Sequence, residues 1–175
     1  HTRCSRDWSS DVCSSDLSES MIAQTTRLIG SRGWENRVSL VHGSLESLSC
    51  NQQFNGATCI LVSHFMEGDQ AKTSLFRQIG ERLTKGGRLI VADACDEDSE
   101  SFRTMMDCRW NFARARGADA NRYQKFQADC REALKPVPPE HEEQLIRSAG
   151  FQSVRRFWTS LHINAWVAWD HSARI

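Results

Sequence analysis

Two apolar, β-branched segments with an amphipathic helix between them restrict the fold of this chain more than any other feature. Residues 57–63 (ATCILVS) and 88–93 (RLIVAD) each predict a buried strand, the first covered on both faces of a parallel sheet. Residues 69–83 carry apolar side chains at helical spacing, and 85–87 (KGG) predict a tight turn before the second strand. Strand, helix and strand at this spacing predict a right-handed βαβ unit, and therefore an α/β fold.

Further elements extend this unit on both sides. In chain order we expect a helix over 18–31, a strand over 38–43, one or two helices over 100–134, a helix over 140–149, and strands over 151–158 and 161–169. Only Thr159-Ser160 separates the last two strands, which implies an antiparallel pair. One face of the central helix is predicted to be apolar, and its residues are Ala71, Leu75, Ile79 and Leu83.

The first residues of the chain are of a different kind. Arg6 to Leu17, RDWSSDVCSSDL, matches the in-frame translation of a sequencing-library adapter, and His1-Thr2-Arg3 fits the upstream primer of that adapter. We therefore expect residues 1–17 to be an artefact that is disordered or non-native. Residues 18–175 are expected to form part of a natural domain, which the reading frame enters near Ser18.

Composition excludes some classes of function. The chain carries 22 Lys+Arg and 22 Asp+Glu, so charge provides no argument for binding to nucleic acid or to a membrane surface. No apolar run approaches the roughly 20 residues that span a bilayer. Of the 7 cysteines, Cys4 and Cys13 lie in the adapter-like segment. The others form no CxxC pair and have no histidine at zinc spacing, which predicts free thiols in a reducing cytoplasm and no metal site.

Four stretches, taken in order, resemble class I S-adenosylmethionine-dependent methyltransferases. VSLVHGSLESL (38–48) resembles the third strand of that family and the loop toward the adenine, and CILVSHFMEGDQ (59–70) resembles the fourth strand and its loop. IGERLTKGGRLIVAD (79–93) is the most specific stretch, and HEEQLIRSAGFQSVRRFW (141–158) resembles the helix and the sixth strand around an AGF turn. The likeness covers nearly everything after residue 17.

The resemblance implies a Rossmann-like methyltransferase sheet that lacks its first strands and ends in an antiparallel hairpin. It also implies S-adenosylmethionine as the cofactor and a small molecule or a nucleoside as the methyl acceptor. In such sheets, ligands bind beyond the carboxyl ends of the strands. The cofactor contacts are therefore expected at Gly43, Ser44, Leu45, Val62, Ser63 and His64.

The chain also departs from the family pattern. The glycine-rich first loop has no counterpart, and the acid that binds the ribose hydroxyls is missing from the natural part. Asp16 stands at the position of that acid, but it lies in the adapter-like segment, and we interpret the match as coincidence. Ser44 stands where the family usually has an acidic residue. We therefore expect the 175-residue fragment to be marginally stable, with negligible methyl transfer of its own.

His64 is the candidate catalytic residue, because a base in this loop could reach a proton of the acceptor. The alternative is a packing role beside the cofactor, since methyl transfer to a good nucleophile needs mainly in-line positioning. Asp93 either belongs to the site or caps the next helix. A face of the last strand formed by His162, Asn164 and Trp166 either meets the substrate or packs in the interior.

Two further alternatives stay open. Basic and aromatic residues alternate between 109 and 126, a pattern that could engage RNA such as tRNA or simply form a solvated helix face. An NAD(P)-dependent oxidoreductase fragment on a similar doubly wound sheet competes with the methyltransferase hypothesis, although the terminal hairpin favours the methyltransferase. A fragment without any function is the remaining alternative.

Overall fold

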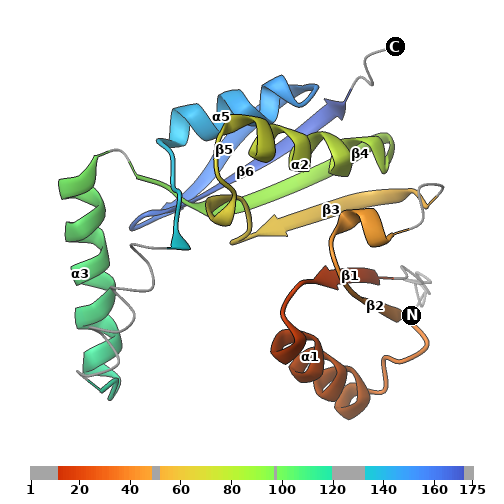
Figure 1. The fold of residues 1–175 in the computed structure, drawn as a ribbon, viewed down its shortest axis with the longest axis horizontal. Helices are drawn as coiled ribbons and strands as arrows, with labels where there is room; N and C mark the ends of the chain where they lie inside the picture. Colours follow the sequence, from red (N-terminus) through yellow and green to blue (C-terminus); the bar gives the residue numbers. More distant parts are fainter. Residues whose placement is uncertain (1–11, 49–51, 97, 120–132, 172–175) are drawn as a thin grey trace, which may run out of the picture. The chain divides into compact units, whose positions relative to one another are not determined.

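The structure is a computed structural model that describes residues 12–48, 52–96, 98–119 and 133–171, and these belong to two compact units. The first unit spans residues 1–52 and the second spans 53–175. Figure 1 shows the elements of both. The elements of each unit follow from its own residues.

The first unit consists of two paired parallel strands and the helix that connects them. Strand β1 (Val12–Asp16) pairs with β2 (Val38–His42), and α1 (Glu19–Arg32) connects them. Ser18 caps α1, because its hydroxyl accepts a hydrogen bond from the Met21 N–H, and Gly33 ends the helix at φ 65° in the left-handed region that glycine tolerates. The 3₁₀ helix η1 (Leu45–Ser47) follows β2. The helix and the strand predicted for this region are confirmed.

Strand β1 lies in the adapter-like segment. Residues 1–17 were expected to be disordered or non-native; of these, residues 1–11 lie outside the described part, and residues 12–16 form the strand. Their β-compatible sequence VCSSD pairs in register with β2, from Val12 beside Val38 to Asp16 beside His42. Residues 12–16 are therefore described as a strand, and the artefactual, non-native character expected for residues 1–17 stays a prediction.

The second unit contains a four-stranded mixed sheet in the order β3-β4-β6-β5. Strand β3 (Phe54–Ile60) runs parallel to β4 (Leu83–Ala94), and β6 (Ile163–His171) is antiparallel to both β4 and β5 (Phe151–Ser160). This is the predicted α/β sheet with its terminal antiparallel hairpin. Three α-helices and a 3₁₀ helix complete the described unit: η2 (Ser63–Phe65), α2 (Asp69–Glu81), α3 (Ser99–Ala115) and α5 (Pro139–Ser148).

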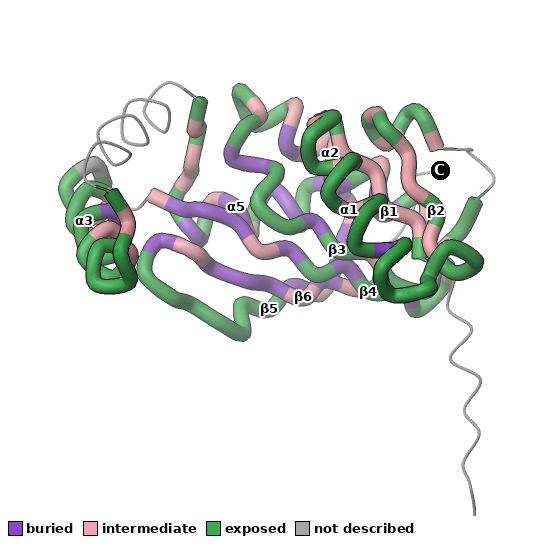
Figure 2. Tube along the Cα trace, turned by 90° about the horizontal axis from the view of Figure 1, so that it is seen from below, coloured by how far each residue is buried: buried purple, intermediate pink, exposed green. Residues whose placement is uncertain are grey.

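Helices α2 and α5 pack on one face of this sheet, whereas α3 stands at one end of it (Figure 1). Burial along β4 alternates accordingly: Leu89 and Val91 are fully buried under the helices, and Ile90 between them is 38% exposed. Figure 2 shows the buried residues concentrated on β4, β6 and the two packed helices. The core of the second unit is therefore the layer between this sheet face and the two helices.

Three predictions about these elements were wrong in detail. The segment 57–63 was expected to be covered on both faces, but β3 begins at Phe54, is an edge strand of its sheet, and buries only Cys59 along its length. The turn of the final hairpin lies at Leu161-His162 and not at Thr159-Ser160, because the two strands pair up to Ser160 and Ile163. The predicted turn over 85–87 lies inside β4, where Gly86 has φ 80° and β3 and β4 shift register.

The buried face of α2 also differs from the predicted one. It consists of Phe76, Ile79 and Gly80 together with Lys72, whereas Leu75 is only half-buried. The predicted stripe began at Ala71, whereas the buried stripe begins one position later, at Lys72. Its side chain is 1% exposed, four residues before Phe76 and thus on the same stripe of the helix.

Candidate functional site

The carboxyl ends of the parallel strands β3 and β4 place η2 beside Asp93. The Leu61 N–H still donates to the Ala92 carbonyl at 2.8 Å, and Leu61 then adopts φ 56°, which turns the chain away from the sheet. The residues of η2 follow directly. In open α/β sheets this edge is where ligands bind.

Asp93 collects four hydrogen bonds on its two carboxylate oxygens. Oδ2 accepts from the backbone N–H of Ser63 at 2.7 Å and from that of His64 at 3.3 Å. Oδ1 accepts from the backbone N–H of Ala94 at 2.8 Å and is hydrogen-bonded to Nδ1 of the His64 ring. Asp93 is fully buried and thus fastens η2 to the end of β4. Sequence reasoning had left its role open between the site and a cap of the next helix; the structure shows that Asp93 binds η2 and that Asp98 caps α3.

The charge of Asp93 is favoured by this arrangement. Burial by itself would raise the pKa of the Asp93 carboxyl, but the hydrogen bond and the charge of His64, together with the bonds from Ser63 and Ala94, outweigh it and lower the pKa. The carboxylate also holds the His64 ring by Nδ1, so that Nε2 is the ring nitrogen left for another group. His64 is 4% exposed and packs its ring against Phe65.

Ser63 is held by two further charged side chains. Its hydroxyl donates to Oε1 of Glu142 on α5, and its carbonyl accepts from Nζ of Lys72 on α2 at 2.8 Å. Ser63, Lys72 and Glu142 are each 1% exposed. Burial raises the pKa of the Glu142 carboxyl, and Asp93 adds to this, while the Ser63 hydrogen bond and the Lys72 charge oppose it.

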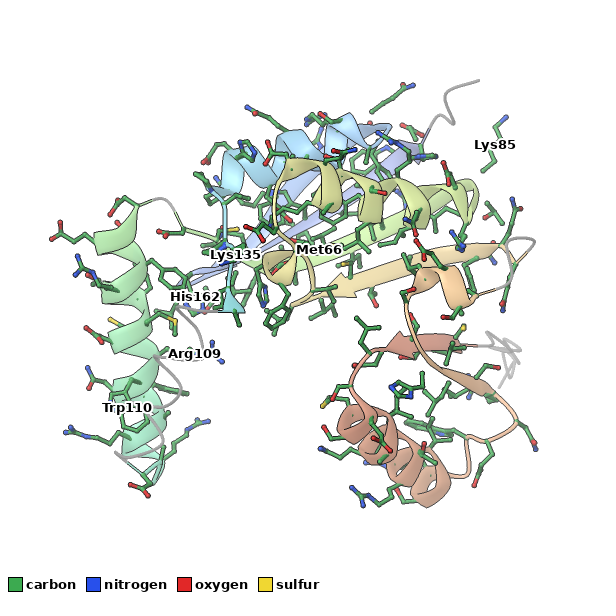
Figure 3. The ribbon with its side chains drawn as sticks, viewed as in Figure 1. Met66, Lys85, Arg109, Trp110, Lys135 and His162 are labelled. Carbon is green, nitrogen blue, oxygen red and sulfur yellow. The ribbon has the colours of Figure 1, made fainter. Side chains whose placement is uncertain are left out.

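The turn of the final hairpin contributes a second polar group to this end of the unit. His162 is 5% exposed, its carbonyl accepts from the Cys95 N–H at 2.7 Å, and its Nε2 lies 3.4 Å from Nη1 of Arg109 on α3. Phe102 meets the His162 ring edge-on. Burial, with the Arg109 and His64 charges, lowers the pKa of His162 to about 4. His162 and Arg109 lie near one another in Figure 3.

The predicted cofactor contacts fall into two groups, one in each unit. Val62, Ser63 and His64 belong to the second unit; Val62 is 43% exposed, whereas Ser63 and His64 are buried. The hydroxyl, carbonyl and N–H of Ser63 are all hydrogen-bonded within the protein, so Ser63 supports the turn. Val62 therefore provides the accessible surface of this group.

Gly43, Ser44 and Leu45 belong to the first unit, at the end of β2. The Gly43 N–H donates to the Asp16 carbonyl at 3.0 Å, and Ser44 is exposed with extended backbone. A Cβ on Gly43 would lie 2.4 Å from the Ser47 hydroxyl oxygen and 3.0 Å from its Cβ, so a larger residue would require Ser47 to shift. The Asp16 carboxylate accepts from the Ser18 N–H at 2.7 Å at the start of α1.

Sequence reasoning missed Lys72 and Glu142. Neither was named as a candidate, and only the four-residue spacing of Lys72 to Phe76 could have indicated that Lys72 is buried. His162, Asn164 and Trp166 are all buried, as the packing alternative predicts; Asn164 and Trp166 lie on β6, with Trp166 opposite Val91 of β4, whereas His162 lies in the hairpin turn and not on the strand. The basic and aromatic stretch between 109 and 126 lies partly outside the described residues.

Within the described ranges, no group of histidine, cysteine and carboxylate side chains could hold a metal ion. The described cysteines are free thiols, namely Cys13, Cys59, Cys95 and Cys108. Burial raises the pKa of both Cys59 and Cys95 to about 12, which makes them poor nucleophiles. No described helix is long and apolar enough to span a bilayer.

Comparison with known proteins rests on solved structures. No protein-family model matches the chain, and a search of curated proteins also found no match. A putative O-methyltransferase from Nostoc punctiforme PCC 73102 is 14% identical with a TM-score of 0.64, over 91% of this chain and 44% of that chain. Human N-acetylserotonin methyltransferase in complex with S-adenosylmethionine is 14% identical with a TM-score of 0.59, over 93% of this chain and 41% of that chain.

A third similar structure is that of a protein named for a different reaction. The [4+2]-cyclase SpnF is 20% identical with a TM-score of 0.57, over 86% of this chain and 46% of that chain. The chain thus spans about half the length of these similar structures. The comparisons show that it has the α/β fold of S-adenosylmethionine-dependent methyltransferases, and the cyclase illustrates that the fold alone does not define the reaction.

Proposed function

We propose that this chain is part of an S-adenosylmethionine-dependent methyltransferase whose acceptor is a small molecule or a nucleoside. The observation that carries the proposal is the η2 turn, which Asp93 fastens at the carboxyl ends of two parallel strands. This is the edge at which α/β sheets bind their ligands. The methyltransferase fold of the similar structures supports the same conclusion.

In the second unit, the proposed cofactor contacts are Val62, Ser63 and His64, and Val62 would cover an apolar part of the ligand. Gly43, Ser44 and Leu45, which follow β2 in the first unit, stay proposed adenosine contacts on the ground of the family resemblance. Ser63 would act indirectly, since its polar groups are engaged within the protein. S-adenosylmethionine, when bound, supplies the electrophilic methyl group.

We assign His64 as the base for an acceptor that must lose a proton. Asp93 holds Nδ1, so Nε2 would take the proton, and the adjacent carboxylate would stabilise the resulting imidazolium. For an acceptor that is already a good nucleophile, the same residues would only orient it.

The proposal is tested by titrating the 175-residue chain with S-adenosylhomocysteine in a calorimeter, followed by competition with NAD⁺. We expect saturable binding that NAD⁺ does not displace. Val62→Asp, which places a charge on an exposed apolar contact, is expected to weaken binding about tenfold. Phe112→Asp, at a 61% exposed position of α3, is the matched control and should leave the affinity unchanged.

The competing hypotheses have distinct outcomes in this experiment. A chain that unfolds cooperatively but binds no S-adenosylhomocysteine would be the fragment without function. Displacement by NAD⁺ would favour the oxidoreductase alternative. Equal weakening by Val62→Asp and Phe112→Asp would show that η2 is not the binding edge.

A further inference from the structure

Ser63 has all three of its polar groups bound to buried charged side chains from three different elements. Asp93 of β4 accepts from its N–H, Lys72 of α2 donates to its carbonyl, and Glu142 of α5 accepts from its hydroxyl. Asp93 is fully buried, and Lys72, Glu142 and Ser63 are each 1% exposed. Ser63, one residue of a short turn, therefore forms hydrogen bonds with three ionisable side chains that are buried away from water.

Such an arrangement is not the simplest way to stabilise a core. Removing charges from water costs several kcal/mol per ion, and a well-packed apolar pair of the same volume is often at least as stable. Charged groups that are buried at this cost can restrict a segment to one of several conformations. The backbone angle of a residue near the start of η2 indicates that the restricted segment here is this turn. Leu61, shortly before the turn, has φ 56°, a backbone conformation that residues other than glycine rarely adopt.

The three interactions hold the turn from different directions. Asp93, near the end of β4, accepts hydrogen bonds from the N–H groups of Ser63 and His64. Lys72 and Glu142 hold the carbonyl and the hydroxyl of Ser63 from the two helices that cover the sheet. Val62 and His64 are the neighbours of Ser63 in the chain, and Asp93 also accepts from the His64 N–H.

We propose that Lys72 and Glu142 are positioning residues, which hold Ser63 and thereby set the backbone of Val62 and His64 for ligand binding. The inference rests on the proposed function, because these neighbours are the proposed contacts of the cofactor and the acceptor. Neither Lys72 nor Glu142 touches the ligand. They act through the carbonyl and the hydroxyl of Ser63.

The experiment combines hydrogen exchange with ligand titration on the full 175-residue chain. In Lys72→Met, which keeps the length of the side chain but loses the donor, the amides of Ser63 and His64 should exchange at least about tenfold faster. The amides of the β6 core should not change. The affinity for S-adenosylhomocysteine should fall about tenfold.

Glu142 provides a conservative pair of variants. Glu142→Gln keeps an oxygen acceptor for the Ser63 hydroxyl and should stay close to the wild type in both measurements. Glu142→Leu removes the acceptor and should behave like Lys72→Met. Glu143→Gln is the matched control, since Glu143 pairs with Arg147 and makes no contact with Ser63 in the described part of the chain.

Each outcome decides the proposal. Local acceleration at Ser63 and His64, with rescue in Glu142→Gln, would support it. Acceleration spread evenly over the sheet, or none at all, would overturn it, because Lys72 and Glu142 would then only fill the core. If the wild type binds no S-adenosylhomocysteine, the proposed function fails, and hydrogen exchange still decides whether the two side chains position the turn.

Discussion

Replacing Asp93 by asparagine is expected to destabilise the second unit strongly, because it changes two of four hydrogen bonds at a fully buried site. The carboxylate accepts from the N–H groups of Ser63, His64 and Ala94 and from the His64 ring. An asparagine has one acceptor oxygen, so its NH₂ group would face donors on the other side. No rotation of the amide avoids this, since both carboxylate oxygens accept from backbone N–H groups.

The magnitude follows from these contacts. A hydrogen bond to a charged group contributes about 1.5–3 kcal/mol. Because asparagine changes two such bonds, we expect Asp93→Asn to lower the free energy of unfolding by about 3–6 kcal/mol at pH 7. Since small domains have about 5–15 kcal/mol in total, the variant would lose a large part of its stability.

Urea unfolding followed by circular dichroism measures this loss. Asp170→Asn is the matched control: Asp170 is exposed and lies at φ 57°, a conformation that asparagine also tolerates, so its change should stay within about 0.5 kcal/mol. If Asp93→Asn stays within about 1 kcal/mol of the wild type, the four hydrogen bonds do not fasten η2 as described.

The same residue has a pH signature with a defined sign. The pKa of Asp93 is lowered in the folded state, so the folded protein binds this proton less readily than the unfolded chain. Its stabilising contribution is complete above the ordinary value of 3.8 and is lost as pH falls through the lowered folded pKa. The difference in free energy of unfolding between the wild type and Asp93→Asn should therefore be constant near neutral pH. It should become smaller only below about pH 3.8, where the carboxyl of the wild type begins to be protonated in the unfolded chain.

Two further predictions follow from burial and charge. Phe76→Ala, at a fully buried position, should cost about 3–5 kcal/mol in urea unfolding, clearly more than Leu75→Ala at the half-buried neighbour; equal losses would contradict the assigned face of α2. His162 has its pKa lowered from 6.5 to about 4, so the folded state binds fewer protons in this range and stability should fall on acidification from pH 6.5 to 4. This loss of stability can be measured as a decrease in melting temperature, which should be smaller in His162→Gln. If His162→Gln shows the same decrease as the wild type, another group causes the loss.

Local patterns were sufficient to predict much of the second unit. Helix α2 and strand β4 follow from apolar periodicity, and Pro139 begins α5 as the first-turn preference of proline predicts. The wrong details have a common cause. Serine is a more common turn residue than leucine or histidine, so the local preference pointed to Thr159-Ser160, and only pairing across the hairpin decided that the turn lies at Leu161-His162. Burial of β3 depended equally on which strands lie beside it.

By itself, the sequence determined the type and order of the elements, because periodicity and turn residues act within a few positions of the chain. It also led to the SHF turn after β3 as the candidate site, since loops at the carboxyl ends of parallel strands face ligands. Only the tertiary structure decided what holds that turn. Asp93, Lys72 and Glu142 are separated from Ser63 by 30, 9 and 79 positions. Their burial depends on two helices meeting over the sheet, and no local pattern encodes a contact between charges that distant in the chain.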